Sequence, residues 1–250
     1  MEKFFNTAGP IKTNLHHYVP MEERWDVDRV QMMIRQQKYF ILHAPRQTGK
    51  TSSILALADF LNQRGEYVAV YANIEPAQAA REDVSRGIRA VLVSIASALR
   101  YFTKSELLRD HWLPIFEQAG PEKALEELLS FWAEQSPKPV VLILDEVDAL
   151  IGDTLISLLR QLRAGYNKRP EGFPVSVILC GVRDVRDYRI HSARTKEIVT
   201  GGSAFNVKAE SLRMENFSRE QIAQLYRQHT EATGQIWEEG ILALAWHYTE

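Results

Sequence analysis

The segment at residues 44–51 constrains the fold of this 250-residue chain more than any other feature. It reads Ala-Pro-Arg-Gln-Thr-Gly-Lys-Thr, and it lies between an apolar run at 39–43 and a helical pattern at 52–61. Backbone N–H groups at the start of a helix lack intrahelical partners, and the helix dipole favours negative charge there. A loop that joins a strand to a helix in this way predicts a phosphate-binding loop within an α/β fold.

The residues of this loop predict contacts with a nucleoside triphosphate. Gly49 lets the backbone approach the phosphates, Lys50 reaches the β- and γ-phosphates, and the hydroxyl of Thr51 is a ligand for Mg²⁺. Ala44 stands where the usual pattern has glycine, so its backbone must avoid positive φ. The alternative is a chance Gly-Lys-Thr at the start of a helix. The expected nucleotide contacts in the loop are Ala44, Pro45, Arg46, Gln47, Thr48, Gly49, Lys50, Thr51 and Ser52.

A second segment, residues 139–148, places acidic side chains directly after a strand. Five aliphatic residues at 140–144 suit a central strand that is buried on both faces. Asp145 and Glu146 then follow at its carboxyl end, where open α/β sheets bind ligands. We expect Asp145 to hold Mg²⁺ and Glu146 to position and polarise the attacking water. Taken alone these acids could cap the next helix, but with the upstream loop they favour nucleotide hydrolysis over binding alone.

Strands alternate with helices along most of the chain, which predicts a parallel sheet with helices on both faces. No internal repeat or low-complexity tract interrupts this pattern. Residues 1–20 read as an extended arm. The predicted strands are 39–43, 67–72, 140–144, 175–180 and 207–214. The predicted helices are 21–38, 52–64, 81–102, 104–135 with breaks near Pro114 and 120–121, 154–166, 218–232 and 236–248.

Composition narrows the class of protein further. A net charge of −2 gives no strong overall attraction to nucleic acid, and 45% hydrophobic residues support a substantial core. The single cysteine, Cys180, excludes an internal disulfide framework and fits a reducing compartment. The first residues lack the apolar stretch of a signal peptide, and no apolar run is long enough to cross a membrane. We therefore expect a cytoplasmic protein.

Four segments resemble those of the AAA+/STAND-related ATPases, in particular the bacterial AAA-like domain proteins. These segments are 44–51, 141–148, 177–186, and 203–206 preceding Leu212. More distantly, the chain is similar to replication-initiator ATPases of the origin-recognition type. The resemblance implies a P-loop NTPase of three α/β/α layers, with a five-stranded parallel sheet in the order 5-1-4-3-2. It also implies ATP and Mg²⁺ as cofactors, an arm and first helix at 1–38, a core at 39–215 and the start of a helical lid at 216–250.

Two further site residues follow from the resemblance. Such families place a polar sensor at the end of the fourth strand, where this chain has Arg183 as the candidate for contact with the γ-phosphate. The alternative is that Arg183, Arg186 and Arg189 form a solvated or partner-facing surface. Related ATPases lay the segment before the first core helix against adenine, so Tyr18 is a candidate for stacking on the base. Tyr18 could equally be ordinary packing.

The segment at 160–196 has a local excess of positive charge, with nine Lys or Arg against three acids. Such an excess could face DNA, a protein partner or the nucleotide of a neighbouring subunit in a homo-oligomer. The alternative is a solvated surface without a partner. The basic residues are Arg160, Arg163, Lys168, Arg169, Arg183, Arg186, Arg189, Arg194 and Lys196.

The chain stops within an apolar helical pattern at 241–248, which needs a partner. Either this helix folds back onto the core or the chain is a fragment, and we favour the fragment.

Three functions stay open from the sequence. The favoured one is an ATPase that couples nucleotide state to conformational change or assembly, slow in isolation. The alternatives are a non-catalytic ATP/ADP switch and a DNA-binding adaptor with structural nucleotide.

Overall fold

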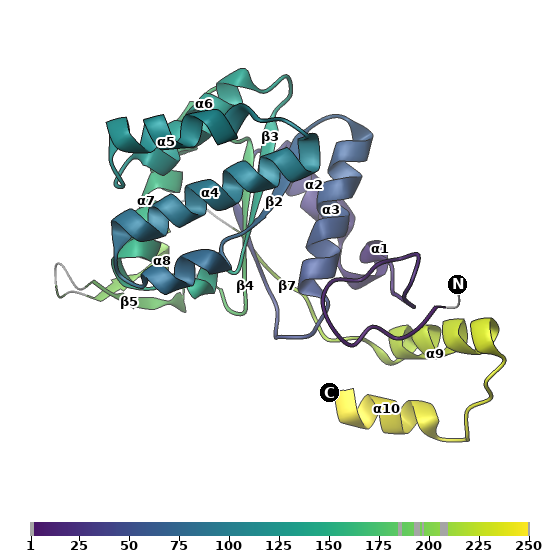
Figure 1. The fold of residues 1–250 in the computed structure, drawn as a ribbon. Helices are drawn as coiled ribbons and strands as arrows, with labels where there is room; N and C mark the ends of the chain where they lie inside the picture. The colour runs from purple at the N-terminus through teal and green to yellow at the C-terminus, as the bar shows by residue number, and fades with distance from the viewer. Residues whose placement is uncertain (1–2, 185–186, 193–195, 197, 206–209, 250) are drawn as a thin grey trace.

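A parallel five-stranded sheet forms the centre of the computed structural model, which describes residues 3–184, 187–192, 196, 198–205 and 210–249 (Figure 1). The strands lie in the order β2-β3-β4-β1-β7. Their bounds are β1 (Phe40–His43), β2 (Val68–Asn73), β3 (Val140–Asp145), β4 (Ser176–Gly181) and β7 (Glu210–Arg213). With β7 as the fifth strand of the core, the predicted order 5-1-4-3-2 is confirmed. Residues 207–209 of the predicted fifth strand lie outside the described residues.

Helices cover both faces of this sheet and complete the predicted three layers. On one face lie α1 (Met21–Arg24), α2 (Val27–Arg35) and α3 (Lys50–Arg64). On the other lie α4 (Val84–Thr103), α5 (Leu107–Ala119), α6 (Ala124–Gln135), α7 (Gly152–Ala164) and α8 (Gly201–Phe205). Along β3, Val141 and Ile143 belong to the apolar core on the face covered by α1, α2 and α3. Leu142 and Leu144 belong to the core on the opposite face. A strand between two helical layers must be apolar on both faces, which explains the continuous aliphatic run.

Two helical predictions need correction. The helix expected at 21–38 is divided into α1 and α2, because the Asp26 side chain accepts a hydrogen bond from the backbone N–H of Arg29 and starts a new helix. The break expected near Pro114 is wrong, since α5 continues through this residue. Pro114 and Asp110, four residues earlier, are both exposed, so the carbonyl that loses its helical partner lies on the solvent side.

The connection between β4 and β7 contains elements that the sequence did not predict. Strands β5 (Arg189–His191) and β6 (Ile198–Thr200) pair antiparallel in a separate two-stranded sheet, followed by α8. Three-residue strands are too short to show the alternation on which sequence prediction depends. Three short 3-10 helices, η1 (Glu75–Ala80), η2 (Val147–Ala149) and η3 (Gly165–Lys168), complete the connections.

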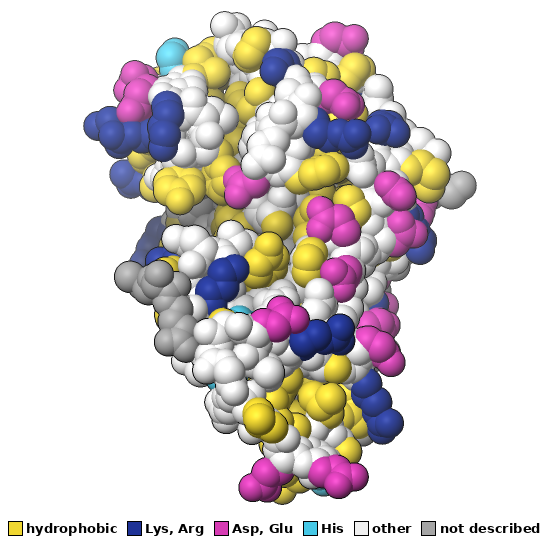
Figure 2. Space-filling view, turned by 90° about the vertical axis from the view of Figure 1, so that its right-hand side faces the viewer, with side chains coloured by type: hydrophobic (Ala, Val, Ile, Leu, Met, Phe, Trp, Pro, Cys, Tyr) yellow, Lys and Arg dark blue, Asp and Glu magenta, His cyan; other side chains and the backbone are white. Residues whose placement is uncertain are grey.

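The last two helices extend away from the sheet, with α9 (Arg219–Thr233) near the N-terminal arm and α10 (Ile241–Thr249) beneath it (Figure 1). Helix α10 packs on α9, where the guanidinium of Arg219 lies 5.2 Å from the ring centre of Trp246. No residue of α10 is buried, so this helix does not fold back into the core. Figure 2 shows apolar side chains on this lower end of the molecule. The division into core and lid at residue 215 stays a prediction.

Candidate functional site

The loop at 44–49 leads into α3 and contains two residues with positive φ. Gly49, directly before the helix, has φ +83°, and Gln47 has φ +65°. Glycine adopts such a conformation without steric cost, which explains its place at the start of α3. Ala44 is fully buried without positive φ, as expected, and its N–H donates to the carbonyl of Gly181 at 3.2 Å. The loop is thereby attached to the end of β4.

The carboxylate of Asp145 is the centre of the site. Lys50 Nζ lies 2.5 Å from its Oδ1, and the hydroxyl of Thr51 donates to its Oδ2 at 3.1 Å. Tyr71 donates to the same Oδ2 at 3.0 Å, and the backbone N–H of Glu146 donates to Oδ1 at 2.9 Å. Asp145 is only 1% exposed. Burial of a carboxylate is costly unless it is paired and hydrogen-bonded, and these four contacts supply that pairing.

The electrostatics of the site differ between the lysine and the second acid. Burial by itself lowers the pKa of Lys50, but the charge and hydrogen bond of Asp145 outweigh burial and raise it. Burial raises the pKa of Glu146, against the opposing effect of Lys50, whose Nζ lies 3.8 Å from Glu146 Oε1. Glu146 itself has φ +61°, a strained conformation for a non-glycine residue. Its side chain is partly exposed.

Tyr71 is a site residue that the sequence analysis missed. It lies on β2, the edge strand next to β3, and pairs with Ile143 two positions before Asp145. Burial, followed by the nearby charge of Asp145, raises the pKa of its hydroxyl, which therefore stays protonated and donates. The signal was a tyrosine near the carboxyl end of a strand, but its neighbour becomes known only once the strand order is known.

The oxygen donors of Thr51 and Asp145 suit a magnesium ion. Both side chains meet at 3.1 Å, directly beside the start of α3. Magnesium usually takes one or two protein oxygens and completes its shell with water and phosphate oxygens. Accordingly, within the described residues no cluster of three or more His, Cys, Asp or Glu is arranged around a metal. The residues present fit the ion that the resemblance implies.

Arg183 lies two residues beyond the end of β4, and its side chain is exposed. Among the described residues, no hydrogen bond joins its guanidinium to Asp145 or Glu146. Gly181 is closely packed, since a Cβ there would lie 2.7 Å from Asp148 Oδ1. The structure therefore brings Lys50, Thr51, Asp145 and Glu146 together and leaves Arg183 outside this bonded group.

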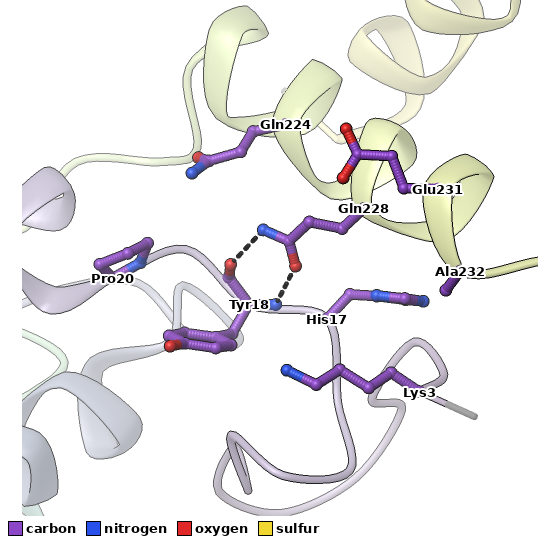
Figure 3. A pocket seen from close by; sticks show the side chains of 8 residues that line it. All are labelled: Lys3, His17, Tyr18, Pro20, Gln224, Gln228, Glu231 and Ala232. Atoms are coloured by element: carbon purple, nitrogen blue, oxygen red, sulfur yellow. Dashed lines mark hydrogen bonds between the residues drawn. The ribbon is translucent and has the colours of Figure 1, made fainter. Parts of the chain in front are cut away.

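Tyr18 lines a cavity of about 410 Å³ between the N-terminal arm and α9 (Figure 3). Gln228 holds the backbone of Tyr18 with two hydrogen bonds, accepting from its N–H at 3.0 Å and donating to its carbonyl at 2.8 Å. The other residues that line the cavity are Lys3, His17, Pro20, Gln224, Glu231 and Ala232. None of the residues that line this cavity belongs to the loop at 44–52.

A family model described as an AAA domain matches residues 33–188, well over half of the chain. The chain belongs to the AAA domain family. The match includes both the loop before α3 and the acidic end of β3, so the AAA+ resemblance inferred from the sequence is confirmed. Among curated proteins, none matches this sequence.

Two solved structures share the fold of this AAA domain. The Walker-type ATPase PABY2304 of Pyrococcus abyssi has a TM-score of 0.56 and 15% identity, covering 91% of this chain and 64% of the other. Cdc6p of Pyrobaculum aerophilum has a TM-score of 0.50 and 18% identity, covering 86% of this chain and 52% of the other. The 250-residue chain thus spans less than two thirds of the length of either protein. At these identities the likeness shows the fold.

The basic segment of this AAA domain is only partly available to a partner. Lys168 pairs with Glu126 at 2.6 Å, and Arg169 stacks on the ring of Tyr166 at 3.5 Å and donates to its carbonyl at 2.6 Å. Arg160, Arg163, Arg183 and Lys196 are exposed. Arg186 and Arg194 lie outside the described residues, as does the side chain of Arg189. Helices long and apolar enough to span a bilayer are absent from the described chain.

Proposed function

We propose that this AAA domain binds ATP and hydrolyses it with Mg²⁺, and that the nucleotide state changes the position of α9 and α10. The observation that carries the proposal is the network around Asp145. It joins a lysine and a threonine at the start of α3 to the acidic end of β3, and these are the two places where an α/β sheet presents a phosphate and a metal. A salt bridge with a purely structural role would not need residues with positive φ before the lysine or a second acid after the aspartate.

Each residue has a separate task in this proposal. Lys50 leaves Asp145 and turns to the β- and γ-phosphates, where the unpaired N–H groups of the loop and of the start of α3 also point. Thr51 and Asp145 supply oxygen ligands to Mg²⁺, which neutralises phosphate charge when bound. Glu146 accepts the proton of the attacking water, and its raised pKa makes it a better base than an ordinary glutamate.

We place the base of the nucleotide beside Tyr18. Tyr18 lines a cavity whose volume of about 410 Å³ is within the range of small-molecule sites. The arm that carries Tyr18 also contacts α3, because the backbone N–H of Ile11 donates to Ser52 Oγ at 2.9 Å. One segment of chain therefore joins the proposed base site to the proposed phosphate site. The ordinary packing role of Tyr18 is the alternative that a Tyr18 variant tests.

Hydrolysis by the isolated chain is proposed to be slow. The exposed position of Arg183 favours this view, because an arginine that stabilises the transferred phosphoryl group contributes roughly 10³–10⁵ in rate. An arginine from a neighbouring copy or another partner would then complete the site. If hydrolysis is absent under all conditions, the protein acts as an ATP/ADP switch instead. The cytoplasmic location and the DNA-binding adaptor role stay predictions.

Single-turnover hydrolysis of ATP tests the enzymatic part of the proposal. Glu146→Gln should retain ATP binding and lose turnover by on the order of 10²-fold or more, because an amide cannot act as the base. Glu171→Gln, an exposed acid in the loop before β4, is the matched control and should behave as wild type. Equal turnover in Glu146→Gln and wild type would remove Glu146 from the mechanism.

The same assay at several protein concentrations tests the need for a partner. Specific activity should rise with concentration if a second copy supplies the missing arginine. Addition of double-stranded DNA forms a separate arm, which distinguishes a nucleic-acid activator from self-association. Fast turnover that stays constant down to concentrations of monomer alone would show that the chain completes its own site, and Arg183→Ala would then identify the residue responsible.

A further inference from the structure

Arg24, the last residue of α1, connects the phosphate-binding loop to the start of α9. It is only 8% exposed. Its Nη2 donates to the carbonyl oxygens of Thr48 at 2.9 Å and Glu215 at 2.8 Å. Its Nη1 donates to the carbonyl of Asn216 at 3.3 Å and to Oε1 of Gln221 at 2.8 Å. One side chain therefore holds the loop, the connection at 215–217 and helix α9.

The surroundings of this guanidinium are unusual for a buried charge. All four oxygens that accept its hydrogen bonds are neutral, and no ion pair of Arg24 occurs in the described part of the chain. Burial accordingly lowers its pKa. A buried cation without a counter-ion is costly unless several aligned acceptors hold it. The burial of the Arg24 side chain is therefore favourable only where the loop and the residues before α9 both supply acceptors.

Phe217 adds a second contact between the same two parts. Its ring centre lies 3.9 Å from the guanidinium carbon of Arg24. The edge of the ring lies 3.8 Å from the place that a Cβ on Gly49 would occupy. The residue before α9 thus lies near the glycine that immediately precedes Lys50.

Gln221 carries the contact into α9 itself. Its Oε1 accepts from the backbone N–H of Ser218 at 3.0 Å, while Ser218 Oγ accepts from the N–H of Gln221 at 3.3 Å. This reciprocal cap starts the helix. The same Oε1 accepts from Arg24, and Nε2 donates to the carbonyl of Glu23 at 2.5 Å. The first turn of α9 is therefore tied to the end of α1.

We propose that Arg24 is a positioning residue that transmits the conformation of the phosphate-binding loop to α9. This inference rests on the proposed nucleotide binding, because phosphate in the loop is what changes its backbone. When the carbonyl of Thr48 shifts, Arg24 carries the shift to residues 215–217 and to Gln221. The arrangement gives α9 two preferred positions, one for the empty loop and one for the filled loop.

Backbone hydrogen exchange with and without ATP tests this coupling. In wild type, ATP should change the exchange of amides at 46–49 and at 215–221 together. Arg24→Lys retains the charge but cannot form the same four bonds, since lysine has one nitrogen. In this variant ATP should still protect the loop, while its effect on 215–221 should fall by about 10-fold, the scale of one lost charge-assisted hydrogen bond.

Arg29→Lys is the matched control, because Arg29 on α2 also contacts the C-terminal part of the chain but is exposed. It pairs with Glu210 at 3.3 Å and touches neither the loop nor α9. Backbone hydrogen exchange of the Arg29→Lys variant should match that of wild type with and without ATP. If Arg24→Lys fails to fold, Gln221→Leu removes the acceptor on α9 and leaves the bond to Thr48. That variant should also lose the effect of ATP on 215–221.

The outcomes separate this inference from the proposed function. Absence of ATP binding by wild type in a calorimetric titration would overturn the proposed function. The coupling would then be judged without nucleotide, where Arg24→Lys should speed exchange at 46–49 and 215–221 together. If exchange rises in only one of these segments, or if ATP still changes both in Arg24→Lys, the role of Arg24 is wrong.

Discussion

The carboxyl edge of the sheet and the seam between the N-terminal arm and α9 are built in different ways. At the edge, Asp145 is 1% exposed and holds four donors around one carboxylate, on a strand buried along its whole length. At the seam, Gln228 bonds to the backbone of Tyr18 beside an open cavity, and His17 contacts His229 at 3.2 Å. Only Ile222 of α9 is buried.

This difference indicates separate roles for the two regions. Charge-assisted bonds inside a packed sheet hold the proposed phosphate-binding residues in place. A helix with one buried residue opens at low free-energy cost, because it loses few apolar contacts. In the proposed function the edge is the fixed part of the site, whereas the seam is the part that moves. Arg24 lies between them and contacts both.

Lys50→Ala should give the largest effect if the edge dominates binding. The variant removes the mobile cation directed at the phosphates and should weaken ATP by about 100-fold or more, as expected for a charge-assisted contact in a buried site. Isothermal titration measures the affinity. Lys38→Ala, which removes a more exposed lysine paired with Glu210, is the control and should bind ATP normally. Undiminished affinity in Lys50→Ala would refute the proposed phosphate site.

Thr51→Ala should give the next largest effect, and only when Mg²⁺ is present. The loss of one ligand oxygen should weaken Mg²⁺–ATP by roughly 10-fold. The same titration in EDTA provides the control, because metal-free nucleotide does not need the hydroxyl as a ligand. An equal loss of affinity in both conditions would assign Thr51 to phosphate contact or to loop structure instead.

Tyr18→Ala tests whether the seam contributes to binding at all. Stacking of an aromatic ring on a base is worth roughly 1–3 kcal/mol, which predicts a loss of about 10-fold in affinity for ATP. Tyr18→Phe keeps the ring and should bind as wild type. Inorganic triphosphate lacks a base, so its affinity should be the same in all three proteins. Full ATP affinity in Tyr18→Ala would show that the tyrosine only packs.

Acidification should produce the smallest effect, confined to the seam. Burial, then the nearby His229 and Lys3, lower the pKa of His17 below its ordinary value of 6.5. The folded state therefore binds fewer protons than the unfolded state, and the stability contribution of His17 is present above pH 6.5 and lost as pH falls through its lowered pKa. Urea unfolding at several pH values should show a smaller acid loss in His17→Gln.

His111→Gln serves as the control for this comparison, because His111 is exposed on α5 and distant in sequence from the seam. It shows how far the removal of a histidine outside the seam changes the same measurement. His17 also faces Phe5 from the arm, while Gln235 accepts or donates to His229 at 2.9 Å. If His17→Gln and wild type lose stability equally on acidification, His17 does not contribute to the acid sensitivity of the fold.

The sequence alone was sufficient to bring together the lysine, the threonine and the two acids at the edge of the sheet. Gly49, Lys50 and Thr51 follow one strand and precede one helix, while Asp145 and Glu146 end another strand. In parallel sheets all strand ends of one kind lie together, so local order along the chain determined that these residues meet. The strand order followed from the resemblance and was confirmed by the structure.

The tertiary structure decided the parts that join distant segments. Tyr71 reaches Asp145 only because β2 is the neighbour of β3, and Arg24 reaches Thr48 and Gln221 only because α1 lies between the loop and α9. Such contacts have no fixed spacing in the sequence, since each depends on how whole elements pack. A sequence motif shows residues that lie close together along the chain. The proposed coupling of the loop to α9 instead depends on one buried arginine, whose acceptors on Thr48 and Gln221 lie 24 and 197 residues away.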